Sequence, residues 1–309
     1  MLLALDVGNT NVVGGLYDGR HLVTQWRVST TPQRTADELH VLWDGLLRTR
    51  NLTLSAVDGA CLASVVPSLT GSYRELAEQR IGVPTVVISN QIDLGIGIDT
   101  DNPPEVGADR LMNALAARER YGAPAVVADF GTSTNFDVVG PTGDFVGGVI
   151  APGMAASVEA LVARTAQLHR IALQRPPHAI GRNTTASMQS GAFFGYVGLV
   201  EGILERILAE LGGRATVVAT GGLAGIIVPE TKLIEHVDPD LTLEGIRLVW
   251  ERHRPHPPTP AGRFAGPRQR KRGESLPRGL RPGTPARTSG EPGGMGAEPP
   301  RKTLTQPES

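Results

Sequence analysis

Two short segments of the chain place an aspartate, a glycine and small hydroxyl or amide residues directly after an apolar run. The first is Asp6-Val-Gly-Asn-Thr-Asn11 and the second is Asp129-Phe-Gly-Thr-Ser-Thr134. At the tip of a hairpin, such a segment presents a carboxylate that suits magnesium and backbone N–H groups that suit phosphate. One copy alone is equally typical of an ordinary turn. Two tandem copies favour facing loops that clamp a polyphosphate from both sides.

The two segments belong to a longer internal repeat. They align if one residue is inserted in the second copy, and each continues into an extended run, a glycine turn and another strand. Self-similarity of this kind predicts two homologous α/β domains, 1–115 and 116–254. A third segment, 255–309, differs in composition and forms a tail.

The sequence between the motifs predicts the elements that position them. Apolar and alternating runs predict strands at 2–7, 12–17 and 22–28, which form an antiparallel meander, and at 60–65, 84–88, 125–129 and 215–219. Capping residues and helical spacing predict helices at 36–49, around Leu111, at 184–211 and from Leu243 onward.

A third glycine-rich segment, Ala219-Thr-Gly-Gly-Leu-Ala-Gly225, follows an apolar strand. Glycines there would let the backbone lie against a flat ligand such as a nucleotide base or ribose, although a simple turn between strand and helix explains them as well. The chain contains neither a GxxxxGK[ST] nor a GxGxxG motif, which argues against P-loop and Rossmann interpretations.

Composition excludes several classes of protein. With 40% hydrophobic and 20% charged residues, the chain is a soluble globular protein rather than a collagen-like or wholly disordered one. The single cysteine, Cys61, cannot form an internal disulfide, so a reducing compartment is expected. Asp6 interrupts the apolar N-terminus before a signal peptide could form, and charges at Glu201, Glu205 and Arg206 interrupt the longest apolar stretch. We therefore expect a cytoplasmic protein without a membrane partner.

The charge balance hides an asymmetry. From Pro255 to Ser309 there are ten Lys/Arg and four Asp/Glu, and half of the 24 prolines. Such a tail buries too little apolar surface to fold and is expected to be disordered. The basic run Arg268–Arg272 is better explained by solvation than by nucleic-acid binding. The remaining residues carry 20 basic and 27 acidic groups, which also argues against a nucleic-acid partner.

Taken together, the motifs resemble the superfamily of acetate and sugar kinases, Hsp70 and actin, and within it the type III pantothenate kinases. The resemblance covers about residues 1–254. Six segments occur in the order found in that family: Asp6-Val-Gly-Asn-Thr-Asn11, Asn102-Pro-Pro-Glu-Val-Gly-Ala-Asp-Arg110, Asp129-Phe-Gly-Thr-Ser-Thr134, Gly147-Gly-Val-Ile-Ala-Pro-Gly153, Gly181-Arg-Asn-Thr184 and Ala219-Thr-Gly-Gly222. The resemblance implies an α/β fold of two tandem ribonuclease H-like (actin-like ATPase) domains, whose mixed sheets are flanked by helices. It also implies ATP-dependent phosphorylation of pantothenate, the first step towards coenzyme A.

The resemblance further implies which residues bind ATP and metal ions. Asp6 would hold the Mg²⁺ that accompanies ATP, and Asp129 would bind an activating monovalent cation, K⁺ or NH₄⁺. The ATP phosphates would contact Asp6, Val7, Gly8, Asn9, Thr10, Asn11, Val12, Val13 and, from the second loop, Thr132.

A second set of residues is implied to handle pantothenate. Asp109 would act as the general base toward the primary hydroxyl, and Gly107, Ala108, Asp109 and Arg110 would bind the substrate. Without the resemblance, the Asp-Arg pair is better explained as a charge at a helix N-terminus with a surface partner. Thr184 would contact substrate at the start of the long helix, where an N-cap role explains a threonine equally well.

Two positions depart from the family pattern, and one alternative function stays open. Thr100 stands where many members have an aromatic residue, and Arg182 stands where lysine is common. Relatives of this fold include Bvg accessory factors, which are linked to transcription, and Hsp70-like proteins, which use ATP for conformational work. The acidic body and the aspartate at 109 favour catalysis.

A homodimer is also expected, with the pantothenate pocket at or near the subunit interface. The predicted helix 184–211 carries nearly consecutive apolar residues. One domain face need not cover all of them, and surplus apolar surface often marks self-association. A central core helix explains the same pattern equally well, and the dimeric habit of the family favours the dimer.

Overall fold

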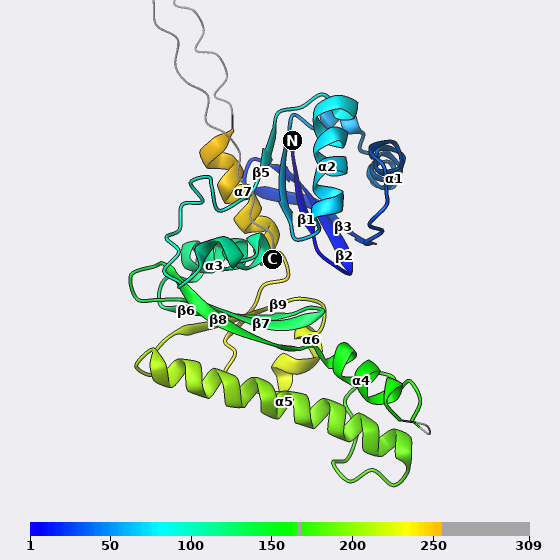
Figure 1. Ribbon diagram of the computed structural model, residues 1–309, viewed down its shortest axis with the longest axis vertical. Coiled ribbons are helices and arrows are strands. Elements are labelled where there is room, and N and C mark those ends of the chain that lie inside the picture. Colours follow the sequence, from blue (N-terminus) through cyan, green and yellow to red (C-terminus); the bar gives the residue numbers. More distant parts are fainter. Residues whose placement is uncertain (166–167, 255–309) are drawn as a thin grey trace, which may run out of the picture. The chain divides into compact units, whose positions relative to one another are not determined.

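A computed structural model describes residues 1–165 and 168–254 of the 309-residue chain. The expected tail at 255–309, its disorder and its basic run lie outside the described residues. The described residues form two five-stranded mixed sheets (Figure 1). The strands of the first sheet are β1 (Leu2–Val7), β2 (Asn11–Asp18), β3 (His21–Ser29), β4 (Gly59–Ser64) and β5 (Thr85–Val87). Those of the second sheet are β6 (Ala125–Phe130), β7 (Ser133–Val139), β8 (Phe145–Pro152), β9 (Thr216–Thr220) and β10 (His236–Val237).

The two sheets share one topology. The first has the order β3-β2-β1-β4-β5 and the second the order β10-β9-β6-β7-β8, which is the same order read in reverse. In each, an antiparallel meander of three strands is followed by two parallel strands. The predicted α/β fold with a tandem repeat is therefore confirmed, while the limits 1–115 and 116–254 stay predictions.

The alignment of the two copies needs one correction. Asp6 pairs with Val13 across the first hairpin, seven residues away, and Asp129 pairs with Asn135 across the second, six residues away. The extra residue thus lies in the first loop, the reverse of the predicted insertion. The sequence similarity of the loops misled the alignment because strand pairing, and not residue identity, sets the length of a hairpin loop.

Helices cover both faces of each sheet and connect the strands. They are α1 (Ala36–Arg48), α2 (Pro67–Glu75), α3 (Ala108–Tyr121), α4 (Met154–Ala163), α5 (Thr184–Glu210), α6 (Ala224–Ile227) and α7 (Leu241–His253). Shorter helical turns are η1 (Leu54–Ala56), η2 (Leu76–Ile81), η3 (Pro103–Glu105) and η4 (Val228–Glu230). The capping box predicted for α1 is present, because the Thr35 hydroxyl accepts from the Glu38 N–H while the Glu38 carboxylate accepts from the Thr35 N–H. Helices α2 and α4 were not predicted, and neither begins with a side-chain cap.

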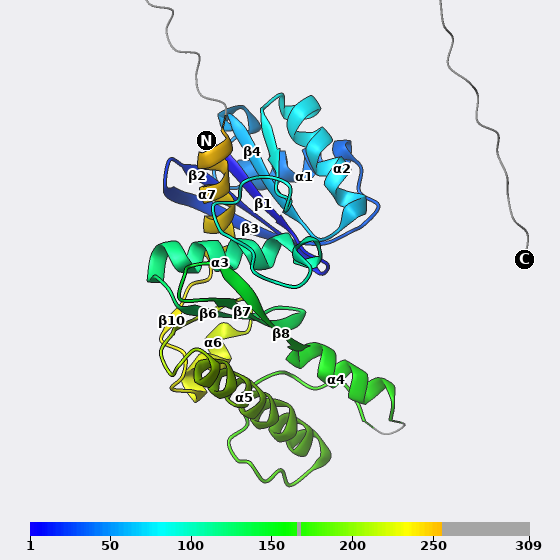
Figure 2. The ribbon, with the colours of Figure 1, turned by 60° about the vertical axis from the view of Figure 1, so that its left-hand side comes forward.

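Two helices form the layer between the sheets (Figures 1 and 2). α3 packs on β6 and β7 of the second sheet, while α7, the last element in the described chain, packs on β1 and β4 of the first. The two helices cross closely, because a Cβ at Gly245 would lie 2.2 Å from the Met112 carbonyl oxygen. One continuous apolar cluster, which includes Leu111, Met112 and Ile246, joins both sheets through these helices.

The outer faces of the sheets carry their own cores. α1 and α2 bury Trp43 and Tyr73 against the first sheet, and α5 buries Phe193, Tyr196 and Val200 against the second. Among the described residues, no helix is both long enough and apolar enough to span a membrane.

Candidate active site

The tips of the two repeated hairpins meet. The Thr10 and Thr132 hydroxyls lie 2.7 Å apart, within hydrogen-bond distance, although 122 residues separate them in the sequence. Each tip follows an inner strand whose next-to-last residue is an aspartate, Asp6 in β1 and Asp129 in β6. The repeat predicted from the sequence therefore brings two equivalent loops and two equivalent carboxylates to one place.

Backbone contacts fix the conformation of both loops. The Gly8 N–H donates to the Asn11 carbonyl and the Gly131 N–H donates to the Ser133 carbonyl, each over 3.0 Å. The first loop is also braced by the end of β3, since the Thr30 hydroxyl donates to the Gly8 carbonyl over 2.6 Å. Thr30 was not predicted to take part in the site, because nothing in its local sequence indicates this contact across 22 residues.

The third carboxylate comes from α3. Asp109 lies in the first turn of this helix, and its Oδ1 accepts a hydrogen bond from the Arg110 N–H over 2.9 Å. Gly107 leaves room for that carboxylate, because a Cβ at this position would lie 2.6 Å from Asp109 Oδ1. The helix start thus aims Asp109 into the space beside the two hairpins.

The three aspartates line a single cleft with a volume of about 500 Å³. Its walls also come from the glycine segment at Gly221 and Gly222, from α4 and from the first turn of α7. Of the residues predicted to bind ATP, the cleft is lined by Asp6, Gly8, Asn9, Thr10, Asn11, Val13 and Thr132.

Several predicted site residues lie outside this lining. The side chains of Val7 and Val12 are buried in the core, so only their backbone could face a ligand. Gly107 and Ala108 directly precede Asp109 in the sequence and are not among the described residues that line the cleft.

Burial raises the pKa of all three aspartates, and neighbouring carboxylates add to this effect at Asp6 and Asp129. Burial, followed by the charges of Asp109 and Asp129, raises the pKa of Asp6 to about 8. Burial is also the main cause that raises the pKa of Asp129 to about 6 and the pKa of Asp109 above its usual range. Neighbouring carboxylates in a shielded cleft disfavour their own ionisation, and this cluster would therefore be stabilised by cations.

One cation in the cleft was missed by sequence reasoning. Among the described residues that line the cleft, Arg27 on β3 is the one basic side chain. Its charge lowers the pKa of both Asp6 and Asp129, opposing the effect of burial. Arg27 pairs with Val13 across β2 and β3, so the register of the meander, which places it next to the first loop, was the available signal.

Arg110 does not lie in the cleft lining. Its Nε donates to Asp137 Oδ1 on β7 over 2.6 Å, and its guanidinium lies 5.4 Å from the centre of the Phe145 ring. Asp137 is fully buried, and its pKa is raised to about 7, mainly by burial. The surface partner considered for Arg110 is therefore wrong, because its partner is buried in the second sheet.

Thr184 lies apart from the three aspartates. It lines a separate apolar groove between α4 and α5. The N-cap role considered for it is wrong, because Asn183 is the cap and its side chain accepts from the Ala186 N–H over 2.8 Å. Arg182 beside it is exposed, and Thr100 has a buried hydroxyl without a partner among the described residues.

The donor set is compatible with Mg²⁺ that arrives with a nucleotide. No group of three or more His, Cys, Asp or Glu in the described part of the chain is arranged to hold a metal ion. Mg²⁺ is commonly held by one or two carboxylates, water and substrate phosphates, and Asp6 beside two phosphate-type loops offers that arrangement.

Asp129 has one oxygen available for a further cation. Its Oδ2 accepts a hydrogen bond from Asn113, whereas its Oδ1 lies against two glycines. A Cβ at Gly221 would lie 2.6 Å from this Oδ1, and a Cβ at Gly131 would lie 3.6 Å from it. The glycines thus leave room for this carboxylate oxygen at the wall of the cleft, and a carboxylate oxygen suits a cation that prefers oxygen ligands.

Comparisons with known proteins agree with this geometry. The sequence model of the type III pantothenate kinase family matches residues 2–206. The type III pantothenate kinase of Moorella thermoacetica is 50% identical over 253 residues, which cover 82% of this chain and 100% of that protein. The corresponding enzyme of Thermomicrobium roseum is 48% identical over 252 residues, or 82% of this chain and 97% of that protein.

A solved structure from Campylobacter jejuni, named for the Baf family of transcriptional activators, shares the fold. Its TM-score is 0.50 at 17% sequence identity, and the match covers 81% of this chain and 98% of that one. At this identity the likeness concerns the fold alone. The family match over two thirds of the sequence, together with relatives that align over nearly their full length, shows that this chain belongs to the type III pantothenate kinase family.

Proposed function

We propose that this chain transfers the γ-phosphoryl group of ATP to the primary hydroxyl of pantothenate, in the cleft between the two hairpin tips. The observation that carries the proposal is the convergence of Asp6, Asp109 and Asp129 in one cleft beneath two touching loops. Family membership supplies the substrates, since its members are named pantothenate kinases.

Asp109 acts as the general base. The substrate hydroxyl oxygen attacks the γ-phosphorus, the bond from that phosphorus to the β–γ bridging oxygen breaks, and ADP leaves while Asp109 takes the hydroxyl proton. Burial raises the pKa of Asp109, which makes its carboxylate a stronger base than an exposed aspartate. General bases are most effective when their pKa lies near the working pH.

The loops and Arg27 bind the phosphates. Backbone N–H groups of 8–13 and of the second loop offer hydrogen bonds to phosphate oxygens, and Arg27 supplies a positive charge among three carboxylates. Asp6 would hold Mg²⁺ together with the phosphates, and the ion would supply positive charge to offset the negative charge that develops during transfer. With these contacts, the protein aligns the reacting groups and stabilises their charge.

Asp129 binds a monovalent cation, K⁺ or NH₄⁺, through its open oxygen. The positive charge of the ion would offset the negative charge of the Asp129 carboxylate, which would otherwise repel Asp109 and the ATP phosphates. Replacing K⁺ by tetramethylammonium should depress the rate of the wild type, and the rate of Asp129→Ala should be the same in both ions. A wild type indifferent to K⁺ would contradict this part of the proposal.

The protein acts as a homodimer that covers the groove between α4 and α5. This groove has a volume of about 470 Å³ and is lined mostly by apolar residues, including Leu161 and Met188. Ile180 beside it is 84% exposed and Leu161 is 47% exposed. Most of the apolar residues of α5 itself are already covered by the sheet, so the surplus surface lies at this groove. Light scattering should give twice the chain mass, and a fully active monomer would contradict the dimer.

The reaction is tested by product analysis. Purified protein with ATP, Mg²⁺, K⁺ and pantothenate should release ADP and form one equivalent of phosphopantothenate, detected by mass spectrometry. Pantothenate with its primary hydroxyl replaced by hydrogen is the matched control and should give no product. ADP release at the same rate with and without pantothenate would instead indicate an ATPase. The cytoplasmic location stays a prediction.

A further inference from the structure

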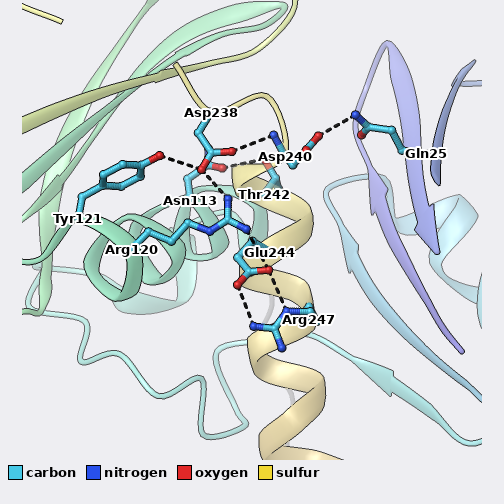
Figure 3. Close-up of polar contacts among 9 residues, drawn as sticks. All are labelled: Gln25, Asn113, Arg120, Tyr121, Asp238, Asp240, Thr242, Glu244 and Arg247. Carbon is cyan, nitrogen blue, oxygen red and sulfur yellow. Dashed lines mark hydrogen bonds and ion pairs between the residues drawn. The ribbon is translucent and has the colours of Figure 1, made fainter. Parts of the chain in front are cut away.

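A buried amide lies directly behind the cleft. Asn113 is on α3 four residues after Asp109, so both side chains lie on one face of the helix. It is only 1% exposed. Its Nδ2 donates to Asp129 Oδ2 over 3.2 Å, and its Oδ1 accepts from the Thr242 hydroxyl over 2.7 Å. Figure 3 shows Asn113 and Thr242 side by side where α3 meets the start of α7.

The two hydrogen bonds fix which end of the amide faces Asp129. A carboxamide has a donor end and an acceptor end, and the Thr242 hydroxyl donates to the acceptor end. The N–H end is therefore directed at the carboxylate. Without the Thr242 hydroxyl, the amide oxygen would lose its donor, and a rotated amide would bring its oxygen against Asp129.

The amide also determines which carboxylate oxygen is left free. Asn113 engages Oδ2, whereas Oδ1 lies against Gly131 and Gly221, which line the cleft with Asp129. Thr242 belongs to a helix that packs on the first sheet, whereas Asp129 lies in the second. The two hydrogen bonds that connect Thr242, Asn113 and Asp129 thus join the two halves of the cleft.

We propose that Asn113 and Thr242 are positioning residues that orient the Asp129 carboxylate toward the cleft, where its free oxygen binds the monovalent cation. The inference rests on the proposed function only for the identity of the cation site. It concerns geometry: both residues act through Asp129, although Thr242 also lines the cleft.

Substitutions of Thr242 separate the hydroxyl from the shape of the side chain. Thr242→Val keeps the shape and removes the hydroxyl, while Thr242→Ser keeps the hydroxyl. Thr85→Val is the matched control. Thr85 is the first residue of β5, its hydroxyl donates to the Val83 carbonyl, and it does not line the cleft.

Two readouts are measured for each protein. One is the rise in unfolding temperature when K⁺ replaces tetramethylammonium in the presence of MgADP, which needs no turnover. The other is the K⁺ concentration that gives half-maximal kinase rate. Thr242→Val should need about 10-fold more K⁺, as expected for about 1.4 kcal/mol from one charge-coupled hydrogen bond. This increase in the required K⁺ concentration should exceed any loss of kcat at saturating K⁺. Thr242→Ser and Thr85→Val should match the wild type.

A double-mutant cycle tests whether Asn113 and Thr242 act through the same connected hydrogen bonds. Asn113→Ala should weaken the K⁺ response at least as much as Thr242→Val. Adding Thr242→Val to Asn113→Ala should then change little, because coupled residues are not additive. Full additivity, or a normal K⁺ response in Thr242→Val, would overturn the proposal, and so would a wild type without any K⁺-dependent stabilisation.

These outcomes distinguish the inference from the proposed function. If pantothenate is not phosphorylated but K⁺ stabilises the wild type and Thr242→Ser more than Thr242→Val, the positioning role stands alone. If phosphorylation is K⁺-activated and Thr242→Val behaves as the wild type in both readouts, the positioning role fails and the kinase function stands.

Discussion

The three cleft aspartates lower the free energy of unfolding of the ligand-free protein. Each is shielded from water, so its ionisation costs free energy that hydrogen bonds, neighbouring arginines and a bound cation offset. A cluster of this kind is tolerated where ligand binding needs it. The same property makes the ligand-free protein sensitive to pH.

The direction of this sensitivity follows from the pKa of Asp6, which rises from 3.8 to about 8 on folding. Between these values the folded protein holds a proton that the unfolded chain has released. The free energy of unfolding should therefore fall as pH rises from 4 to 8 without ligands. Asp129 and Asp137, with pKa values of about 6 and 7, contribute to the fall at lower pH.

Asp6→Asn should flatten the decline, most clearly between pH 6 and 7, where folded Asp6 holds nearly a full proton that the unfolded chain has released. Over this pH unit the wild type should lose more stability than the variant by a difference that approaches about 1.4 kcal/mol, the value of one pKa unit. Urea unfolding of both proteins at four pH values measures this. A wild-type stability that rises over the range would contradict the electrostatic account of the cleft.

At the scale of elements, a buried ion pair holds α3 on the second sheet. Arg110 in the first turn of α3 is paired with the fully buried Asp137 of β7. A Cβ at Gly148 on β8 would lie 2.6 Å from the Arg110 Nη2 atom, so the neighbouring strand leaves room for the guanidinium. Since Asp109 precedes Arg110, the pair also fixes the start of the helix that presents the proposed base.

Removing one partner of this pair should be costly. Asp137→Ala should lower the free energy of unfolding by about 3–5 kcal/mol, because it leaves a buried guanidinium uncompensated. Asp37→Ala is the matched control. It breaks an ion pair of the same 2.6 Å length with Arg80, but Asp37 is 76% exposed, and solvent screening makes such pairs contribute much less to stability. Equal losses in the two variants would show that burial of the Arg110 pair does not matter.

The elements differ in how well the sequence predicts them. The meanders, α1 and α5 were predicted to within a few residues because their signals are local: alternation for the strands, capping residues for α1 and a long apolar run for α5. α2 and α4 lack side-chain caps, and α7 was grouped with the second half although it packs on β1 and β4. Arg27, Asn113 and Thr242 were missed for a related reason. Their partners lie 16 to 129 residues away or across a sheet, and such pairings depend on the assembled fold.

At the scale of the whole molecule, the described residues contain every part of the proposed machinery. The relatives match 82% of this chain and 97–100% of their own length. Contacts group residues Met1–Pro257 into one compact unit. The enzyme therefore needs little beyond α7.

Truncation tests this directly. A chain that ends at Arg254 should fold cooperatively, unfold within about 2 °C of the full chain and keep its kcat within about 2-fold, because α7 and its packing on β1 and β4 are retained. A longer truncation that ends at Leu241 is the contrasting variant and should fail to fold, since it removes Ile246 and Trp250 from the core. Loss of the cooperative transition in the Arg254 variant would contradict the prediction.

The central claim is that Asp109 takes the proton of pantothenate in a cleft that binds ATP independently of this residue. Pantothenate-dependent ADP release by Asp109→Asn, measured beside the wild type with MgATP affinity determined by calorimetry, tests it most directly. The account predicts a kcat lower by about 10²- to 10⁴-fold, because the amide cannot accept the proton, with MgATP affinity within about 3-fold. A variant that turns over near the wild-type rate would contradict the assignment of the base, and with it the proposed mechanism of the cleft.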